Sequence, residues 1–407
     1  MSRTKITIGI IGKTNVGKST LFNAATLLSA EVQPYPFTTK QPNFGIAHVS
    51  APCVCREFKV KDNPRNSVCI NGWRFHPITL IDLPGLIRGA HLGKGLGNQF
   101  LSVASQSDAL IHMVDASGSI DAEGNIIEPG YGDPIADYVD IERELVLWYQ
   151  RLIEGNRQSI EKYEKRYGLI DALHVILSGC KVTKQHIEEA LIASGLMDKD
   201  FKDWTPEDSE IFAEKIRVIS KPTIVVANKI DLKGAIENYY RLSRELKDVI
   251  VVPASAEAEL ALRRAQQKGL VEYVPGDEEF RVKNPHLLTD KQKKALEYME
   301  KFVFSKIMRT GVQFALNTLV FKVMKYKYVY PVEDPNNLSD KSGRVLPDVF
   351  LLPRDATLVD LAQEIHTELA KHLLYGIDVR TGLRLPKDYV LQDRDVIHLV
   401  TAARKRT

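Results

Sequence analysis

Near its N-terminus the chain reads Gly12-Lys13-Thr14-Asn15-Val16-Gly17-Lys18-Ser19. An apolar, β-branched run of strand length, ITIGII at 6–11, precedes this stretch, and a helix-forming run that begins Thr20-Leu21-Phe22 follows it. A strand, a G-x-x-x-x-G-K-S loop and a helix are the context that a P-loop requires. The pattern predicts backbone N–H groups around phosphate oxygens, Lys18 at the β- and γ-phosphates, and Ser19 as a Mg²⁺ ligand.

A second apolar strand, Ile78 to Ile81, ends in Asp82-Leu83-Pro84-Gly85. Following a P-loop, this D-x-x-G turn predicts Asp82 as the acid that holds Mg²⁺ through water. Gly85 can bring its N–H to the γ-phosphate because no side chain blocks the approach.

A third strand, 223–227, ends in Asn228-Lys229-Ile230-Asp231. The Asp231 carboxylate can accept hydrogen bonds from guanine N1–H and N2–H₂, whereas adenine lacks the matching donors, so such a site rejects adenine. We expect Asn228 at the base edge and the Lys229 stem over the base face. A weaker element, Ser255-Ala256, follows the strand 249–252, and its backbone N–H groups could meet guanine O6.

Each of these four elements stands at the C-terminal end of a predicted strand, where an open α/β sheet binds ligands. We therefore expect an α/β fold: a P-loop G domain with a mostly parallel sheet and helices on both faces. The predicted nucleotide-binding residues are Gly12, Lys13, Thr14, Asn15, Val16, Gly17, Lys18, Ser19, Thr20, Phe37, Thr38, Thr39, Asp82, Gly85, Asn228, Lys229, Asp231, Ser255 and Ala256.

Two further blocks connect the chain to a known family: Tyr35-Pro36-Phe37-Thr38-Thr39 with Pro42-Asn43-Phe44-Gly45, and DLPGLIRGAHLGKGLGNQFL at 82–101. They resemble the Obg-like GTPases, specifically the YchF branch, and the C-terminal part is similar to the TGS module, an RNA- or translation-associated ubiquitin-like fold. The resemblance implies that Thr39 is the switch threonine that reaches Mg²⁺ and the γ-phosphate. The residues alone leave Thr38 equally open. Lys18, Thr39 and Gly85 are then the predicted catalytic residues.

The chain departs from YchF in one motif. YchF proteins usually carry N-x-x-E and accept ATP, whereas Asn228-Lys229-Ile230-Asp231 is intact here, as in archaeal-type relatives. We therefore expect GTP rather than ATP, with hydrolysis to GDP and phosphate. A YchF-like ATPase or nucleotide kinase, and an interaction scaffold that nucleotide merely stabilises, are the alternatives.

Hydrolysis is expected to be slow, because Leu86 stands where GTPases usually place a water-positioning glutamine. Asn15 occupies the P-loop position where some relatives coordinate K⁺, so K⁺ could stimulate turnover. The alternative is that Asn15 only orders the loop. An activating partner, or Arg88 entering the site, is a second remedy. The glycines at 89, 93, 95 and 97 suit a switch that orders around the γ-phosphate.

The remaining residues indicate two further domains. Ile141, Leu145, Trp148 and Leu152 recur at helical spacing, and Thr205-Pro206 is typical of a helix start. In the C-terminal region a strand from 345, a helix over 357–369 and a strand from 395 predict an α+β ubiquitin-like sheet. The predicted domains are the G domain at 1–140 and 217–310, an inserted helical domain at 141–216, and a TGS-like domain at 311–407.

Basic residues concentrate in one segment. Residues 281–330 carry a net charge of +8, against −4 for 1–280 and −1 for 331–407. Lys291, Lys293, Lys294, Lys301, Lys306 and Arg309 follow a helical pattern, whereas Lys322, Lys325 and Lys327 alternate with Val323, Tyr326 and Tyr328 as in a strand. Such a surface can bind RNA phosphates and stack bases. The alternative is a charged face that only contacts solvent, which gives the same sequence pattern. With the TGS resemblance it predicts a ribosome or RNA partner.

The amino-acid composition is that of an ordinary globular protein. Of 407 residues, 44% are hydrophobic and 26% charged, as in ordinary globular proteins. We find no run of about 18 apolar residues that would predict a membrane span, and we expect a cytoplasmic protein whose oligomeric state is open. Cys53, Cys55 and Cys69, with His76 nearby, could bind zinc, but their spacing matches no standard finger, so structural or redox-sensitive thiols are the favoured interpretation.

Overall fold

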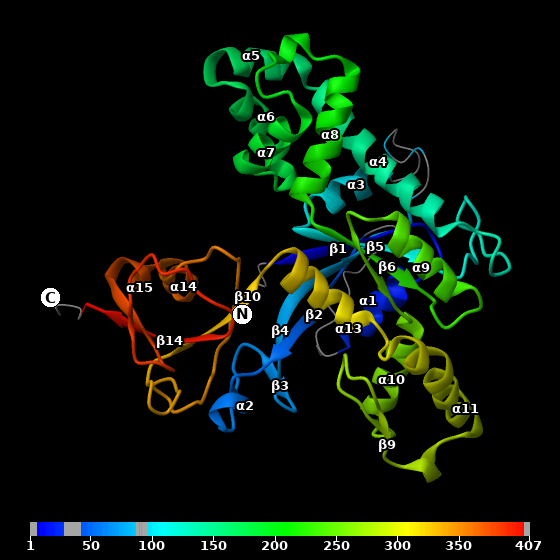
Figure 1. Cartoon of the computed structure of the whole chain (residues 1–407), viewed down its shortest axis with the longest axis vertical. Coiled ribbons are helices and arrows are strands. Elements are labelled where there is room, and N and C mark those ends of the chain that lie inside the picture. The colour runs from blue at the N-terminus through cyan, green and yellow to red at the C-terminus, as the bar shows by residue number, and fades with distance from the viewer. Residues whose placement is uncertain (1–5, 28–41, 87–88, 90, 92–96, 403–407) are drawn as a thin grey trace. The chain divides into compact units, whose positions relative to one another are not determined.

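The computed structural model describes residues 6–27, 42–86, 89, 91 and 97–402 (Figure 1). The chain forms two compact units. The large unit contains Thr4–Ala47 and Ile78–Ala315, and the C-terminal unit contains His48–Pro77 and Leu316–Thr407. Residues 48–77, which the predicted division places in the G domain, therefore group with the C-terminal residues. Across the described residues, no helix is both long and apolar enough to cross a membrane.

The main sheet has the strand order β2-β4-β1-β5-β6-β7, with β3 paired to β4. Neighbours along β4-β1-β5-β6-β7 run parallel. The strands are β1 (Thr7–Ile11), β2 (Asn43–Pro52), β3 (Val68–Ile70), β4 (Trp73–Asp82), β5 (Ala109–Asp115), β6 (Thr223–Asn228) and β7 (Ile250–Pro253). All seven residues of β5 are buried, so this central strand is covered on both faces. The predicted mostly parallel α/β sheet is confirmed.

Helices cover the sheet in the large unit (Figure 1). Those outside the long insertion are α1 (Lys18–Thr26), α3 (Gly97–Ser105), α9 (Ala235–Glu245), α10 (Ala256–Gln267), α11 (Asp290–Met299), α12 (Ser305–Ile307) and α13 (Val312–Asn317). Short turns of other helix types lie at η4 (Pro285–Leu287) and η5 (Glu300–Phe304), and a two-stranded ribbon joins β8 (Val271–Glu272) to β9 (Arg281–Val282). A further short turn, η6 (Thr318–Val323), belongs to the residues of the C-terminal unit.

The insertion between β5 and β6 is helical, as predicted. It contains α4 (Pro134–Glu154), α5 (Arg157–Tyr167), α6 (Leu169–Leu177), η2 (Ser178–Cys180), α7 (Lys184–Ser194), η3 (Phe201–Asp203) and α8 (Pro206–Ser220). Thr205 caps α8 by accepting a hydrogen bond from Asp208 N, which explains the predicted start. Its apolar side chains form one core with Ile11, Ile81 and Leu110 of the sheet. The helices are therefore continuous with the core of the large unit.

The C-terminal unit contains a second sheet with the order β11-β10-β14-β12-β13, in which β10 runs parallel to β14. Its elements are α2 (Cys55–Phe58), β10 (Lys327–Val332), β11 (Phe350–Leu352), α14 (Leu358–Ile365), α15 (Thr367–His372), β12 (Leu373–Asp378), β13 (Arg384–Leu385) and β14 (Asp395–Thr401). This arrangement, with α14 contributing to the core on one face, confirms the predicted small α+β sheet.

Three local predictions in this region were wrong. Residues 322–326 are not strand: η6 runs through Val323, because Leu319 and Val320 are buried in a helical segment, and β10 begins only at Lys327. The strand expected from 345 is limited to β11. The helix expected over 357–369 breaks at His366, whose backbone is extended, into α14 and α15.

Candidate nucleotide-binding site

The loop between β1 and α1 depends on glycine at two positions. Gly12 has φ +143° and Gly17 has φ +100°, a region that residues with a side chain rarely adopt. A Cβ at Gly12 would also collide with the carbonyl oxygen of Met113, and a Cβ at Gly17 with Nδ2 of Asn228. The loop therefore passes close to β5 and to the end of β6, as a P-loop at the edge of a parallel sheet does.

Lys18 is buried inside this loop. Its Nζ donates to the carbonyl oxygens of Gly12 (3.1 Å) and Lys13 (2.5 Å). Burial lowers the pKa of Lys18 to about 8, and the nearby Asp82 carboxylate opposes that shift. The loop thus holds an ammonium whose charge a phosphate would favour.

Ser19 and Asp82 meet, as the two motifs predict. Ser19 Oγ donates to Asp82 Oδ2 at 2.7 Å. Burial raises the pKa of the Asp82 carboxyl, and its Oδ1 is a buried oxygen with no hydrogen-bond partner in the described part of the chain. Hydroxyl and carboxylate oxygens are ligands that Mg²⁺ prefers, and a cation would offset the desolvation of Asp82. The residues present therefore fit a Mg²⁺ site.

The turn after Asp82 lies against the P-loop. A Cβ at Gly85 would stand 2.5 Å from Thr14 Oγ1, so only glycine fits there. Leu86 N donates to Gly12 O at 3.1 Å, and the Leu86 side chain is buried in the core of the large unit. Leu86 therefore faces the core, in agreement with the prediction that it cannot orient a water molecule.

Asn228 joins three loops. Its Nδ2 donates to Val16 O (2.8 Å) in the P-loop, and its Oδ1 accepts from Ala256 N (3.0 Å). The N–H of Ser255 donates to Thr310 O (2.8 Å). The amides expected to face guanine O6 thus already have protein acceptors, and the Asn228 side chain, expected at the base edge, fastens the site together.

Lys229 and Asp231 are held by residues that sequence reasoning missed. Lys229 Nζ donates to Asp115 Oδ2 (2.7 Å) and Ser119 Oγ (3.1 Å), which fixes the direction of its stem. The hydroxyl of Tyr298 lies 3.4 Å from Asp231 Oδ2. Tyr298 comes from α11, and nothing in its local sequence distinguishes it from any other helical tyrosine.

Helix α4 contacts two nucleotide motifs. Lys13 Nζ pairs with Asp137 (2.6 Å) and Asp140 (3.0 Å). The Lys13 side chain, predicted among the nucleotide ligands, is therefore directed to α4, and its carbonyl faces Lys18. Glu144 accepts hydrogen bonds from Gly89 N (2.6 Å) and His91 N (2.9 Å), which ties the segment after Gly85 to the same helix.

The remaining predicted residues divide into two groups. Asn15 is in place, with φ +63°, and its Nδ2 donates to Gly124 O (3.0 Å) in the loop before α4. Thr20 lies in the first turn of α1. Phe37, Thr38, Thr39 and Arg88 lie outside the residues that the structure describes, as do Gly93 and Gly95.

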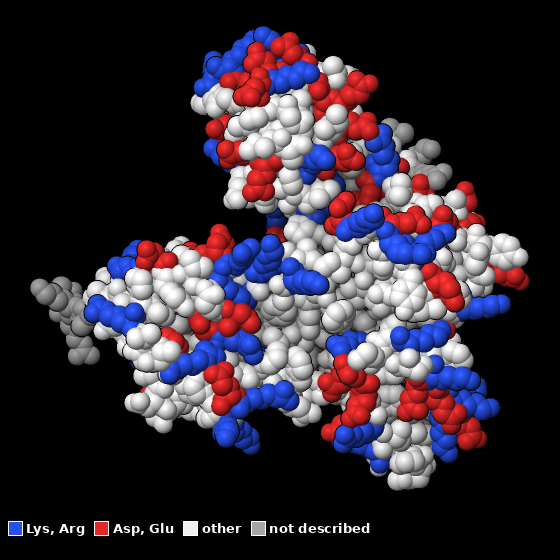
Figure 2. Space-filling model, viewed as in Figure 1, with Lys and Arg blue, Asp and Glu red and all other residues white. Residues whose placement is uncertain are grey.

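The predicted RNA surface is exposed in most of the basic segment, but it loses two of its expected residues to the interior. Lys327 is buried and donates to the carbonyl oxygens of Arg354 and Leu391, and Tyr328 is buried with its hydroxyl on Val49 O (2.7 Å). Lys327 and Tyr328 are therefore interior, whereas Lys322 and Lys325 are exposed and Val323 and Tyr326 are half-buried. The lysines of α11 and the following turns are exposed: Lys291, Lys293, Lys294, Lys301 and Lys306. Around α11 acidic side chains alternate with them (Figure 2).

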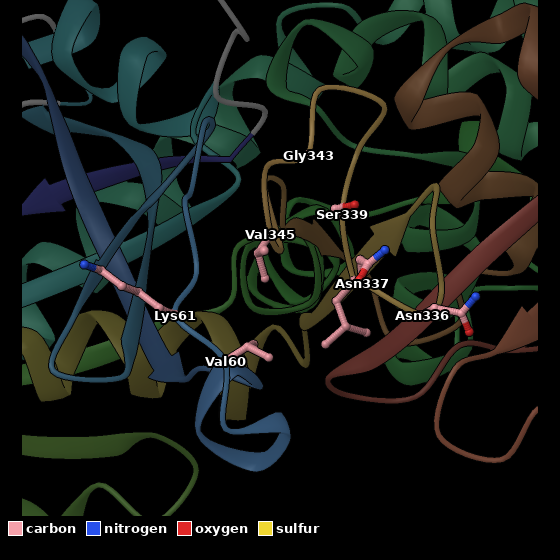
Figure 3. A pocket seen from close by; sticks show the side chains of 8 residues that line it. Val60, Lys61, Asn336, Asn337, Ser339, Gly343 and Val345 are labelled. Carbon is pink, nitrogen blue, oxygen red and sulfur yellow. The ribbon is translucent and has the colours of Figure 1, made fainter.

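A hollow in the C-terminal unit is separate from these motifs (Figure 3). Two segments line it, Val60–Lys61 and the loop that contains Asn336, Asn337, Leu338, Ser339, Gly343 and Val345. In Figure 3 the Lys61 side chain extends away from that loop, and the other lining side chains are uncharged. No residue of the nucleotide motifs lines this hollow.

Fold and site together define a P-loop GTP-binding protein, and comparison with known proteins agrees. Three family models match: a 50S ribosome-binding GTPase model at residues 7–136, the G4 motif-containing domain of YGR210-like Obg-like GTPases at 226–334, and the TGS domain at 342–401. The chain belongs to the YchF/Obg-like family.

Its relatives cover most of the chain. An uncharacterized GTP-binding protein of Methanocaldococcus jannaschii is 43% identical over 98% of this chain and 99% of its own length. The ribosome-binding ATPase YchF of Bacillus subtilis is 32% identical over 65% of this chain and 69% of its own. A crystal structure of a GTP-binding protein from Pyrococcus horikoshii OT3 matches with a TM-score of 0.78 and 32% identity, over 98% of this chain and 100% of that one.

Proposed function

We propose that the protein is a guanine-nucleotide switch that binds GTP in preference to ATP and hydrolyses it slowly to GDP and phosphate. One observation supports this specificity. Asp231 lies three residues after Asn228, the last residue of β6, and the Asn228 side chain holds this strand end by hydrogen bonds to the P-loop and to Ala256. A carboxylate held in that place accepts the two N–H donors of guanine, and adenine would leave it unpaired.

The hydrolytic chemistry follows from charge and position. Lys18 and the loop amides would stabilise charge on the β- and γ-phosphoryl oxygens. Ser19 and Asp82, with Thr39 by family resemblance, would hold Mg²⁺, which when bound neutralises phosphate charge. Because Leu86 is buried in the core, the residue after Gly85 supplies no group to orient water. We therefore expect slow turnover that a cation or a partner accelerates.

The test is binding of fluorescent GTP and ATP analogues, with Mg²⁺, to the wild type and to Asp231→Asn. We expect GTP preference in the wild type and a loss of roughly 10²-fold or more of that preference in the variant, since a paired charge is removed. Asp248→Asn, an exposed change of the same kind, should leave the preference intact.

An ATPase is the second candidate, because the Bacillus relative is named a ribosome-binding ATPase. It predicts equal or tighter ATP binding, and the same competition assay decides between the two. Binding of either nucleotide without turnover would instead favour the scaffold.

We further propose the ribosome as partner and the cytoplasm as the location. The family model for residues 7–136 is described as a ribosome-binding GTPase, and the TGS domain and the exposed lysines of α11 offer surfaces for RNA. Co-sedimentation with ribosomes in the presence of a GTP analogue, but weakly with GDP, is the expected result. Equal co-sedimentation with both nucleotides would contradict a switch.

A further inference from the structure

Four side chains that the nucleotide site does not use converge in the C-terminal unit. Cys53 follows β2, Cys55 opens α2, Asp62 lies in the next loop and Cys69 is in β3. One ligand atom from each, three Sγ and one carboxylate oxygen, lie within 4.8 Å of one another. None of these cysteines forms a disulfide.

The separations suit a tetrahedral metal ion. Cys55 Sγ and Cys69 Sγ are 3.9 Å apart, and Cys53 Sγ is 3.3 Å from Asp62 Oδ2. Zinc–sulfur bonds of about 2.3 Å in tetrahedral geometry place two sulfurs about 3.8 Å apart, and the shorter zinc–oxygen bond brings a carboxylate oxygen closer. The backbone thus already presents four donors near the spacing that zinc requires.

The surroundings place a cation and a backbone donor at Cys53. The Arg74 guanidinium, which is 0% exposed, lies 3.4 Å from Cys53 Sγ and 2.7 Å from Asp62 Oδ2. The N–H of Cys55 approaches Cys53 Sγ at 3.5 Å. Three thiolates and a carboxylate around Zn²⁺ would carry a net charge of −2, which Arg74 reduces, and outer donors of this kind are typical of metal sites.

The cluster also lies where a cross-link would matter. The loop between α2 and β3 is mostly polar, and its residues from Lys59 to Ser67 are exposed or half-buried. Such a segment gains little from apolar packing, so a metal that ties Asp62 to Cys53, Cys55 and Cys69 would order it. Cys53 and Cys55 are buried, which is typical of a closed structural site rather than a catalytic one.

We propose that Cys53, Cys55, Asp62 and Cys69 form a structural zinc site. The sequence names three of these ligands, but it does not predict Asp62, and the fourth candidate, His76, is absent from the cluster. The convergence of these four side chains is the reason we prefer a metal site to the unligated thiols that the spacing alone suggested.

The experiment is metal analysis of the full-length protein, purified under reducing conditions without chelator. We expect about one zinc ion per chain, and a loss of most of it in Cys55→Ser and Cys69→Ser. Cys180→Ser, which changes the remaining cysteine outside the cluster, should keep the zinc. Nucleotide binding is measured in parallel, so failure of this proposal is distinguishable from failure of the proposed function.

A second measurement does not depend on the variants folding. The chelated wild type is reconstituted with Co²⁺, and we expect the visible absorption and sulfur-to-metal charge transfer of a tetrahedral cobalt–thiolate centre. Absence of metal from the wild type together with no cobalt spectrum would overturn the proposal. So would zinc retained by both cysteine variants, or a Cys55–Cys69 disulfide found by mass spectrometry in freshly purified protein.

Discussion

Lys18 is a residue whose protonation should respond to nucleotide binding. Its ammonium is desolvated, which lowers its pKa to about 8, and carbonyl oxygens of its own loop are its acceptors. Phosphate charge stabilises the ammonium and raises that pKa. Between the two pKa values the free protein is partly deprotonated and the bound protein is not, so binding takes up a proton.

This linkage predicts that GTP affinity falls as the pH rises through about 8, by at most about tenfold per pH unit. Calorimetry in buffers of different ionisation enthalpy should detect proton uptake near pH 8 and little near pH 6.5. In Lys18→Arg the guanidinium does not titrate in this range, so any remaining binding should lose the pH dependence. If nucleotide binding takes up no proton at pH 8, Lys18 is not the group that links binding to pH.

The side chain of Asn15 has one oxygen atom that can bind a cation. Its Nδ2 is engaged by Gly124 O, which leaves the side-chain oxygen as the atom that could coordinate K⁺. We expect turnover to be at least about tenfold faster in K⁺ than in Na⁺ at equal ionic strength, less than the ~10³–10⁵ that an arginine finger supplies. Asn15→Ala should lose the difference. If the wild type turns over equally in both salts, Asn15 serves only to hold the 118–127 loop.

At the scale of elements, α4 connects the site to the other helices of the insertion. Near its start, Asp137 forms an ion pair with Lys13 of the P-loop. Further along, the Glu144 carboxylate accepts hydrogen bonds from the backbone N–H groups of Gly89 and His91. Both contacts come from segments next to predicted phosphate contacts. A change in either segment on hydrolysis would therefore act on α4 directly, which gives the insertion a role beyond burial of its own core.

Glu144→Gln tests this connection. The amide has one acceptor oxygen where the carboxylate has two, so about one charge-assisted hydrogen bond, or 1–2 kcal/mol, is lost. We expect hydrogen exchange at Gly89 and His91 to rise by roughly tenfold, and the GTP-dependent protection of α4 to weaken. Glu188→Gln, an exposed change on α7, is the matched control. Unchanged exchange at Gly89 and His91 would show that Glu144 does not hold the segment.

The sequence predicted elements well where a local pattern determines them. The four strands that end in motifs and the capped helix α8 were predicted because periodicity and caps are local signals. The 322–326 stretch was not, because its lysines alternate with apolar residues like a strand, whereas the preceding Leu319 and Val320 are buried in a helical segment that runs through Val323. Asp62 and Tyr298 were missed for another reason: only the folded chain brings them to Cys53 and Asp231.

At the scale of the whole molecule, the proposed ribosome partner raises the question of which surface would contact it. The charge excess of 281–330 suggested one continuous basic surface, but Lys327 and Tyr328 are interior, and Arg309 is paired with Glu278. Exposed cations remain on α11 and the turns that follow it, and also at Arg281, Lys283, Lys322 and Lys325. Helix α11 also carries Tyr298, whose hydroxyl faces Asp231. The same helix therefore presents lysines to solvent and contacts the predicted base-binding carboxylate.

Because α11 has both features, we choose its lysines to test where the ribosome would bind. The triple change Lys291→Glu, Lys293→Glu and Lys294→Glu should weaken co-sedimentation with ribosomes by roughly tenfold or more and flatten its salt dependence, because phosphate contacts release counterions. GTP affinity should change little, since these lysines point to solvent. The matched control reverses Lys162, Lys165 and Arg166 on α5, an equal charge change on another exposed helix. If both triples weaken binding equally, net charge governs the association and α11 is no specific contact. If neither does, the TGS domain is the surface to alter next.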